Sequence, residues 1–318
     1  MSTLLAIQTA ILRTLAYYDT FDYPLTIAEV WRWLYPAPGT SLGAVTVEEV
    51  GRRIDELVTV GKVERRGVYV ALRGRGKIVD VRTERMERGL KLWRRAAGTA
   101  RYLELVPFVK MIAVVNTLAI DNVRPESDID FLIVVAPQHI WISRMIVTGI
   151  VTLLGYRRHG TKIAGRICLS FYVTTEAMDF SKLKGQEDDT HFAFWTSQAV
   201  PLLDDGTYEK FKAANGWVTA LLPNSWSWAW RTKLLVPNSG LGSIKKFYEI
   251  FFSTPVGHWF EAWARSYQVK RMEKNITSKA KLGTTEVIIS EEVLKFHELD
   301  RRQEYNQQFQ RRLTELGR

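Results

Sequence analysis

The stretch at residues 124–135, RPESDIDFLIVV, places two aspartates at the entrance of an apolar run. Asp128 and Asp130 are two positions apart, and alternate residues of a β-strand project from the same face. The spacing therefore predicts two carboxylates side by side at the start of a buried strand. Carboxylate oxygens are ligands that Mg²⁺ prefers, and water and substrate phosphates complete its octahedron. A turn in which Ser127 and Asp128 only cap the strand is the alternative interpretation.

The chain on either side of this stretch changes between strand-like and helix-like patterns. Residues 108–115 and 166–174 are rich in β-branched and aromatic side chains, as strands are. Residues 140–155 have the length and apolar content of a helix. Together with a strand at residues 130–135, these segments predict a mixed sheet, so we expect an α+β fold.

The N-terminal segment predicts three helices followed by a hairpin. Thr26 and Thr46 each precede a glutamate at the third following position, which is the pattern of a capping box at a helix start. Gly67 marks a tight turn between two short strand-like segments. Three helices followed by a two-stranded hairpin is the order of a winged helix, and we expect a winged-helix-like domain here.

Four arginines of this segment are candidates for nucleic-acid contact. In a winged helix the third helix enters a groove, and Arg52 and Arg53 fall on that helix. Arg65 and Arg66 fall at the wing. The alternative interpretation is a solvated helix face in a domain that packs or dimerises.

The length of the chain, 318 residues, suits two or three domains of ordinary size. We expect a winged-helix-like domain at residues 1–75, a basic helical linker at 76–105, a mixed-sheet core at 106–178 and a mostly helical region at 179–318. Between residues 73 and 95, nine basic residues accompany three acidic ones. Binding of a polyanion by the linker is therefore a secondary hypothesis.

The composition narrows the classes of partner and location. The formal net charge of +10 and the pI near 9.6 favour an anionic partner, such as a nucleotide, DNA, RNA or an acidic membrane surface. Cys168 is the only cysteine, which excludes an intrachain disulfide and a cysteine-rich zinc site and suggests a cytoplasmic location. The longest apolar stretch, residues 140–156, contains Ser143 and Arg144 and is shorter than the roughly 20 residues of a transmembrane helix.

The segment NTLAIDNVRPESDID resembles the signature of the DNA polymerase β-type nucleotidyltransferase superfamily. Members of that superfamily have Gly-Ser after one strand and Ser-Asp-x-Asp at the start of the next. Asn116 and Thr117 occupy the Gly-Ser positions, and Ser127, Asp128 and Asp130 match the second element. With the fragments YYDTFDYPLT, KIAGRICLSF, PNSW and LKFHELDRR, the chain is similar to an uncharacterised prokaryotic group of that superfamily with an N-terminal winged-helix-like region.

The resemblance implies a nucleotidyltransferase-like core and a magnesium-dependent reaction. In the superfamily a nucleoside monophosphate passes from a nucleoside triphosphate to an acceptor hydroxyl at a two-metal site. By this resemblance Asp128 and Asp130 are the Mg²⁺ ligands and the catalytic carboxylates. The acceptor is not implied.

The resemblance also implies a nucleotide-binding loop before the Ser-Asp-x-Asp strand. Asn116 would be the point of close backbone approach and Thr117 a phosphate-contacting hydroxyl, and Ser127 would complete the nucleotide site. Arg124 lies in the same loop and would neutralise phosphate charge. Asp121 occupies the place of a second frequent glycine, so we expect its negative charge near the phosphates.

Active members of the superfamily carry a third carboxylate on a later strand. Here that strand, RICLSFYVT, has Ser170 at its centre, and the next acids are Glu176 and Asp179. Three alternatives stay open: one of these acids is the base, another acid or a partner subunit supplies it, or catalysis is lost. A chain without catalysis is expected to be a nucleotide- or nucleic-acid-binding regulator that acts through its winged helix. For either function, a homo-oligomer or a partner subunit is a further expectation.

Overall fold

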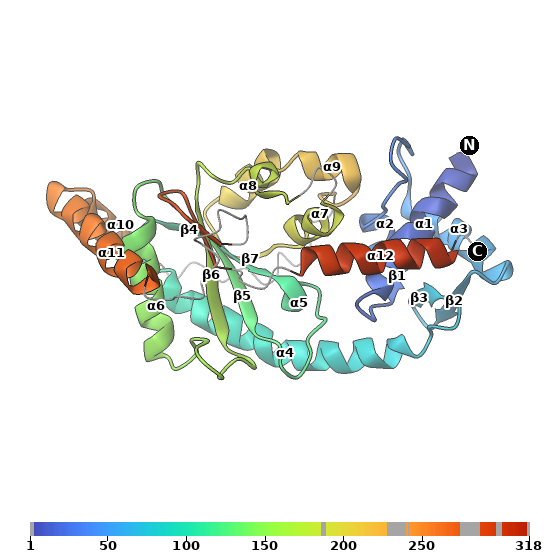
Figure 1. Ribbon diagram of the computed structural model, residues 1–318, viewed down its shortest axis with the longest axis horizontal. Helices are drawn as coiled ribbons and strands as arrows, with labels where there is room; N and C mark the ends of the chain where they lie inside the picture. The colour runs from blue at the N-terminus through green and yellow to red at the C-terminus, as the bar shows by residue number, and fades with distance from the viewer. Residues whose placement is uncertain are drawn as a thin grey trace.

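The computed structural model describes residues 3–185, 189–227, 240, 242–273, 287–296 and 301–316. The fold is α+β, with a small antiparallel sheet near the N-terminus and a larger mixed sheet in the middle of the molecule (Figure 1). The expected fold class is confirmed at this level. Within the described ranges, no helix combines the length and the apolar composition that a membrane crossing requires.

The N-terminal segment forms three helices and a three-stranded sheet in the order β1-β3-β2. Its elements are α1 (Thr3–Asp19), β1 (Leu25–Thr26), α2 (Ile27–Arg32), α3 (Val47–Thr59), β2 (Val63–Arg66) and β3 (Tyr69–Leu72). The capping box at the start of α2 is present, with Thr26 and Glu29 each accepting the other's backbone N–H. Gly67, at a φ of 60°, makes the β2–β3 turn, because L residues rarely adopt that angle.

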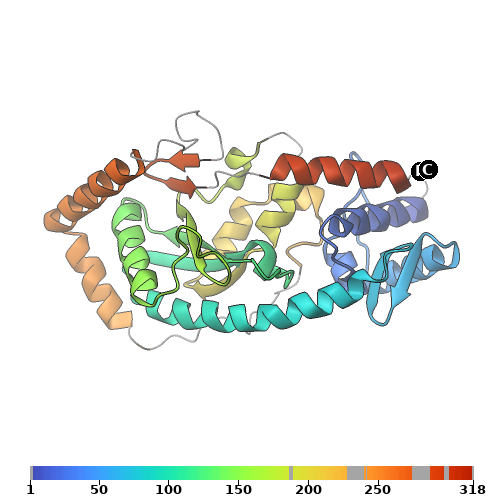
Figure 2. The same cartoon turned by 60° about the horizontal axis from the view of Figure 1, so that its bottom comes forward.

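A single long helix, α4 (Ile78–Leu103), connects this segment to the central sheet. Figure 2 shows α4 running along the molecule from the small sheet to the large one. Its first half is fixed by a buried ion pair, in which the Arg82 guanidinium lies 2.7 Å from a carboxylate oxygen of Glu29 in α2. Both charges are withdrawn from water, so each is stabilised only while the other is in place. The pair therefore sets the position of α4.

Among the described residues, the central sheet has six strands in the order β7-β4-β5-β6-β9-β8. They are β4 (Val109–Val115), β5 (Ile129–Val135), β6 (Ile167–Thr174), β7 (Val200–Asp204), β8 (Val287–Ile289) and β9 (Val293–Phe296). Strands β5 and β6 are parallel and are joined through α6 (Ile140–Leu153), whereas the other pairs are antiparallel. Three of the strands come from residues 179–318, which we expected to be mostly helical.

The two faces of the central sheet are covered by different helices, because its strands alternate between two cores. Ile112 and Ile133 face a core shared with α4 and α6. Met111 and Leu132 face a second core, which includes side chains of α7 (Thr190–Ser197) and α8 (Thr207–Ala214). Asp130 in β5 and Asp128 just before it are in phase with Leu132, so both aspartates belong to the second face.

The N-terminal segment packs on this second face through two later helices. Helix α12 (Arg302–Leu316) contacts α1 and α7, and α7 also contacts the short α9 (Trp217–Leu221). One apolar core joins Tyr18 of α1 with Phe194 of α7 and Phe309 of α12. Figure 1 shows α12 lying beside α1, with both chain ends on that side of the molecule.

At the opposite end, α10 (Gly242–Phe252) and α11 (Pro255–Glu273) form a hairpin beside α6 (Figure 1). The carboxylate of Glu261 in α11 accepts the backbone N–H groups of Trp141 and Ile142, both at 2.8 Å. These are first-turn donors of α6, which lack partners within the helix. Glu261 therefore caps α6 from a neighbouring helix.

Candidate metal centre and adjoining cavity

The two aspartates lie where β5 begins, as the sequence predicts. Asp130 pairs across the sheet with Val115, the last residue of β4, and its carboxylate accepts a hydrogen bond from Asn116 Nδ2 at 2.7 Å. Asp128 lies one strand position before β5, and its carboxylate accepts a hydrogen bond from Arg158 Nη1 at 2.6 Å. Both carboxylates face the same cavity.

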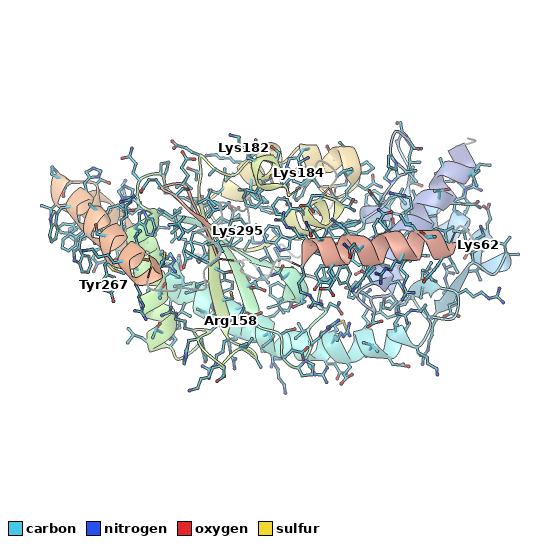
Figure 3. The ribbon with its side chains drawn as sticks, in the orientation of Figure 1. Lys62, Arg158, Lys182, Lys184, Tyr267 and Lys295 are labelled. Atoms are coloured by element: carbon cyan, nitrogen blue, oxygen red, sulfur yellow. The ribbon has the colours of Figure 1, made fainter. Side chains whose placement is uncertain are left out.

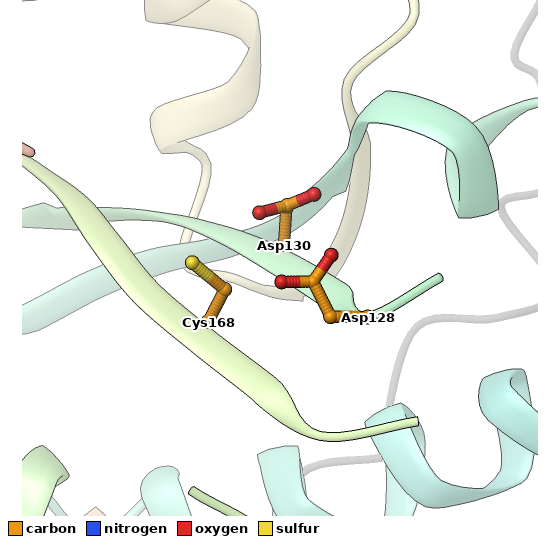
Figure 4. Close-up of side chains that lie close together, drawn as sticks. All are labelled: Asp128, Asp130 and Cys168. Atoms are coloured by element: carbon orange, nitrogen blue, oxygen red, sulfur yellow. The ribbon is translucent and has the colours of Figure 1, made fainter. Parts of the chain in front are cut away.

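The third group beside these carboxylates is a thiol. Because β6 runs parallel to β5, Cys168 is the register partner of Asp130. Ligand atoms of Asp128, Asp130 and Cys168 all lie within 4.8 Å of one another (Figure 4). Burial, followed by the charge of Asp130, raises the pKa of the Cys168 thiol to about 12. The thiol is therefore protonated at neutral pH, and the two carboxylates are the hard ligands of the cluster.

The electrostatics of the pair favour a cation. Burial, and then the neighbouring charge of Asp128, raises the pKa of the Asp130 carboxyl to about 6. The hydrogen bond from Asn116 and the positive charge of Arg158 act in the opposite direction but do not cancel the rise. Negative charge is thus incompletely compensated at this point, and a divalent cation between the two carboxylates would compensate it.

Neither acid considered as a third carboxylate lies with the pair. Glu176 lines a separate cavity together with Glu261 and Glu291. The Asp179 carboxylate accepts a hydrogen bond from the Ser181 backbone N–H at 3.0 Å, as the cap of a short 3₁₀ helix. Within the described residues, the only titratable group that joins the two aspartates in a metal-binding cluster is the Cys168 thiol. The position on the later strand is thus occupied by a thiol next to Ser170, whose Oγ is 3.3 Å from Sγ.

Asn116 adopts a backbone conformation that glycine favours. Its φ is 60°, in the left-handed region that asparagine tolerates better than most L residues. Its side chain donates to Asp130 and accepts a hydrogen bond from the Trp195 indole of α7. Asn116 therefore fixes the Asp130 carboxylate to the sheet and to α7. Thr117 follows it in the single turn of α5 (Asn116–Ala119) and lines the cavity.

The loop between α5 and β5 places Arg124 and Ser127 at the cavity and Asp121 away from it. Ser127 Oγ accepts the Arg124 backbone N–H at 2.9 Å, which closes a tight turn before Asp128. Both residues line the cavity. The Asp121 carboxylate instead accepts a hydrogen bond from the Trp93 indole of α4 at 2.7 Å. Asp121 therefore faces α4 and is not part of the cavity lining.

The cavity beside the aspartates has a volume of about 360 Å³. Four basic side chains line it: Arg124, Lys295, Arg301 and Arg302. Lys295 lies on β9 in the middle of the molecule (Figure 3), and Arg302 starts α12, where its guanidinium is 2.8 Å from Asp189. A cavity with carboxylates and cations in its lining suits a ligand that carries phosphates and a metal ion.

Aromatic side chains form another part of the lining, which we call the aromatic wall: Tyr17, Phe21, His191 and Tyr305. The Tyr17 hydroxyl is 2.8 Å from His191 Nδ1, and the Tyr305 ring centroid is 4.9 Å from those of both Phe21 and His191. Tyr17, His191 and Tyr305 come from α1, α7 and α12, and Phe21 comes from the turn after α1. The sequence does not predict these residues, nor Lys295 and Arg302, as part of the site, because no local pattern connects segments so far apart in the chain.

The four arginines proposed for nucleic-acid contact each form an ion pair. The pairs are Arg52 with Glu49, Arg53 with Glu49 and Glu56, Arg65 with Asp55, and Arg66 with Asp80. Helix α3 carries four acidic residues and two basic ones. The surface of this helix is therefore acidic overall, and none of the four arginines lines the cavity.

No protein-family model, no curated protein and no solved structure significantly matches the chain.

Proposed function

We propose that the chain is a nucleotidyltransferase-like protein that binds a nucleoside triphosphate together with Mg²⁺ in the cavity beside β5. The single observation that carries this proposal is the composition of the cavity. Asp128 and Asp130 line it beside each other, and Lys295 and Arg302 belong to the same lining. A metal-bound phosphate compound would meet both signs of charge in one cavity.

The order of elements supports the nucleotidyltransferase-like assignment of the central sheet. A strand (β4), a single helical turn (α5), the Ser-Asp-x-Asp strand (β5), a helix (α6) and a parallel strand (β6) follow in the expected sequence. The N-terminal order of three helices and a hairpin supports a winged-helix-like unit in the same way. The nucleotidyltransferase-like sheet and the winged-helix-like unit are both part of this proposal.

Magnesium fits the donor set of this site. Asp128 and Asp130 would hold the ion through carboxylate oxygens, while the protonated Cys168 thiol is a poor ligand for a hard cation. When bound, the ion would neutralise phosphate charge and polarise the phosphoryl group. Arg158 now neutralises Asp128, and its guanidinium would have to move aside or turn toward phosphate when the ion binds.

The remaining lining suits the rest of a nucleotide. The volume of about 360 Å³ lies within the range of roughly 300 to 1,000 Å³ that is typical of small-molecule sites. The cations Arg124, Lys295 and Arg302 would bind phosphate oxygens through charge-assisted hydrogen bonds. The aromatic wall offers ring faces on which a base can stack, and such stacking contributes about 1–3 kcal/mol per base in nucleic-acid complexes.

Transfer of the nucleoside monophosphate is the second candidate function, and the paired carboxylates favour it. Against it, the position of the third carboxylate holds Cys168, whose pKa of about 12 prevents it from acting as a base at neutral pH. Deprotonation of an acceptor hydroxyl would then depend on the acceptor or on a partner subunit. Binding of a nucleotide needs only groups that line this cavity, whereas transfer also needs a base that the described lining does not supply.

Calorimetric titration with each nucleoside triphosphate, with and without Mg²⁺, tests the binding proposal. We expect affinity that depends on Mg²⁺ and falls by about tenfold or more in Asp130→Asn, because a charge-assisted contact contributes about 1.5–3 kcal/mol. Asp80→Asn, at an exposed position outside the cavity, is the matched control and is expected to bind as the wild type does. Equal affinity of wild type and Asp130→Asn would refute the assignment.

A radiolabel on the α-phosphate tests transfer separately. Label that reaches an added RNA, protein or small-molecule acceptor with the wild type, but not with Asp128→Ala, supports catalysis. Nucleotide binding without any incorporation identifies a binding protein that lacks transfer. Incorporation that survives Asp128→Ala would contradict the metal site.

A further inference from the structure

Two segments beside the cavity hold most of the net positive charge of the chain. The whole chain contains 44 basic and 34 acidic residues, which gives +10. Helix α4 and the loop at residues 155–166 together contain eleven of the basic residues and three of the acidic ones, which gives +8. The rest of the chain is therefore close to neutral, with a net charge of +2.

The two segments form one surface because they contact each other. The Arg95 guanidinium of α4 donates to the carbonyl of Gly165 and lies over the Tyr156 ring, 4.9 Å from its centroid. We call six side chains of this surface the basic lip: Lys91, Arg94 and Arg95 of α4, and Arg157, Arg158 and Lys162 of the loop. Figure 2 shows this loop, between α6 and β6, close to α4.

The basic lip adjoins the candidate metal centre directly. The Gly165 backbone N–H donates to the carbonyl of Ser127 at 2.7 Å, so the loop is bonded to the turn that precedes Asp128. Arg158 extends from the loop to the Asp128 carboxylate at 2.6 Å, and Figure 3 shows it near the ends of β5 and β6. A polyanion on the lip would thus reach the aspartates.

Most cations of the basic lip are not neutralised. Within the part of the chain that the structure describes, Lys91, Arg94, Arg157 and Lys162 form no ion pair. The candidate arginines of α3 and the β2–β3 hairpin are all paired with carboxylates, as described above. Unpaired cations keep the positive potential that attracts a phosphate backbone.

The extent of the positive surface fits a polymer better than a single nucleotide. Basic residues recur along α4 from Arg88 to Arg101, a run of about 20 Å at roughly 1.5 Å per residue. Loop cations widen this run toward Asp128. We propose that the basic lip binds the phosphate backbone of a single-stranded nucleic acid and directs one end of the strand to the Asp128–Asp130 site.

This proposal rests on the proposed function in one respect: the nucleotide–metal site is what the end of the bound strand would meet. Binding is measured by fluorescence anisotropy with a labelled 20-nucleotide RNA (about one to five site sizes of known single-strand binders) and with DNA of the same sequence, over a range of salt concentrations. The lip variant is Lys91→Ala/Arg94→Ala/Lys162→Ala. The control is Lys62→Ala/Lys182→Ala/Arg311→Ala, which removes two lysines and one arginine at exposed positions outside the lip.

For the lip variant we expect the slope of log affinity against log salt to become shallower by about 2. The reason is that each lost phosphate contact removes roughly 0.7 from the slope for single strands. At about 0.1 M salt this corresponds to a loss of affinity on the order of 100-fold. The control variant is expected to remain within a few-fold of the wild type. The relative strength of the RNA and DNA arms identifies which nucleic acid the lip prefers.

Three results would overturn the proposal. They are equal losses in the lip and control variants, no binding by the wild type at low salt, and binding to phosphatidylserine vesicles without binding to either nucleic acid. Calorimetric titration of Mg²⁺ and nucleotide with the lip variant separates this proposal from the proposed function, since the three substituted residues do not line the cavity. A variant that loses nucleic acid but keeps nucleotide supports the lip. A wild type that binds nucleic acid but no nucleotide refutes the proposed function alone.

Discussion

Replacing Asp130 by asparagine should make the metal-free protein more stable while it removes the metal site. The carboxyl of Asp130 is withdrawn from water beside Asp128, and these two causes raise its pKa from 3.8 to about 6. The folded protein therefore holds this proton up to a higher pH than the unfolded chain does. Stability is lost as the pH rises from about 4 to about 6, and the loss is complete above that range.

The size of the expected gain in stability follows from the pKa values of Asp130 in the unfolded chain and in the folded protein. Their difference corresponds to at most about 3 kcal/mol, at about 1.36 kcal/mol for each pH unit. Asparagine is nearly isosteric and keeps an oxygen for the hydrogen bond from Asn116, so the substitution removes the charge without removing this contact. We expect Asp130→Asn to gain up to about 3 kcal/mol at pH 8, or about 5 °C in melting temperature, and nothing at pH 3.5.

Thermal unfolding in the presence of a chelator, from pH 3.5 to pH 8, measures this gain. Asp80→Asn removes an exposed carboxylate in α4 and is expected to stay within about 0.5 kcal/mol of the wild type at every pH. Added Mg²⁺ should raise the melting temperature of the wild type at pH 8 and leave that of Asp130→Asn unchanged. A destabilised Asp130→Asn variant at pH 8 would refute the reasoning, because the carboxylate would then be stabilised by its surroundings.

Three further substitutions test other parts of the structure. Arg82→Ala should destabilise the protein by about 3–5 kcal/mol in urea unfolding, because it leaves the Glu29 carboxylate buried without its partner. Gly257→Ala should lower the melting temperature by several degrees in a thermal scan, since its Cβ would collide with the backbone carbonyl of Phe252 in the α10–α11 hairpin. The pKa of Glu261 is raised to about 7 by burial, so its contribution to stability declines as the pH rises from about 4.5 to 7. Glu261→Gln should flatten that decline in a pH series of unfolding experiments, and an unchanged profile would contradict the assignment.

The local features of the metal centre were predictable from the sequence. Apolar residues after Asp130 and the two-residue spacing from Asp128 are short-range patterns, and the strand forms within one residue of where they indicate. The Thr26–Glu29 capping box is equally local, since both of its hydrogen bonds lie within four residues. Such features depend on backbone geometry that neighbouring residues set.

The remainder of the site depends on tertiary contacts that no local pattern contains. Cys168 joins the aspartates only because β6 pairs in parallel with β5, in a register that the sequence does not reveal. Lys295 of β9 and Arg302 of α12 reach the cavity from segments that lie more than 150 residues after Asp130 in the chain. Asp121 faces α4 because an indole donor is available there, and nothing in its own loop predicts that donor.

The most direct test of the nucleotide–metal site is a crystal structure of the protein with Mn²⁺ and a non-hydrolysable nucleoside triphosphate, recorded with anomalous scattering. We predict an anomalous peak within coordination distance of carboxylate oxygens of both Asp128 and Asp130, with the phosphates toward Lys295 and Arg302 and the base at the aromatic wall. A bound nucleotide without metal at these carboxylates, or a peak elsewhere on the chain, would contradict the account.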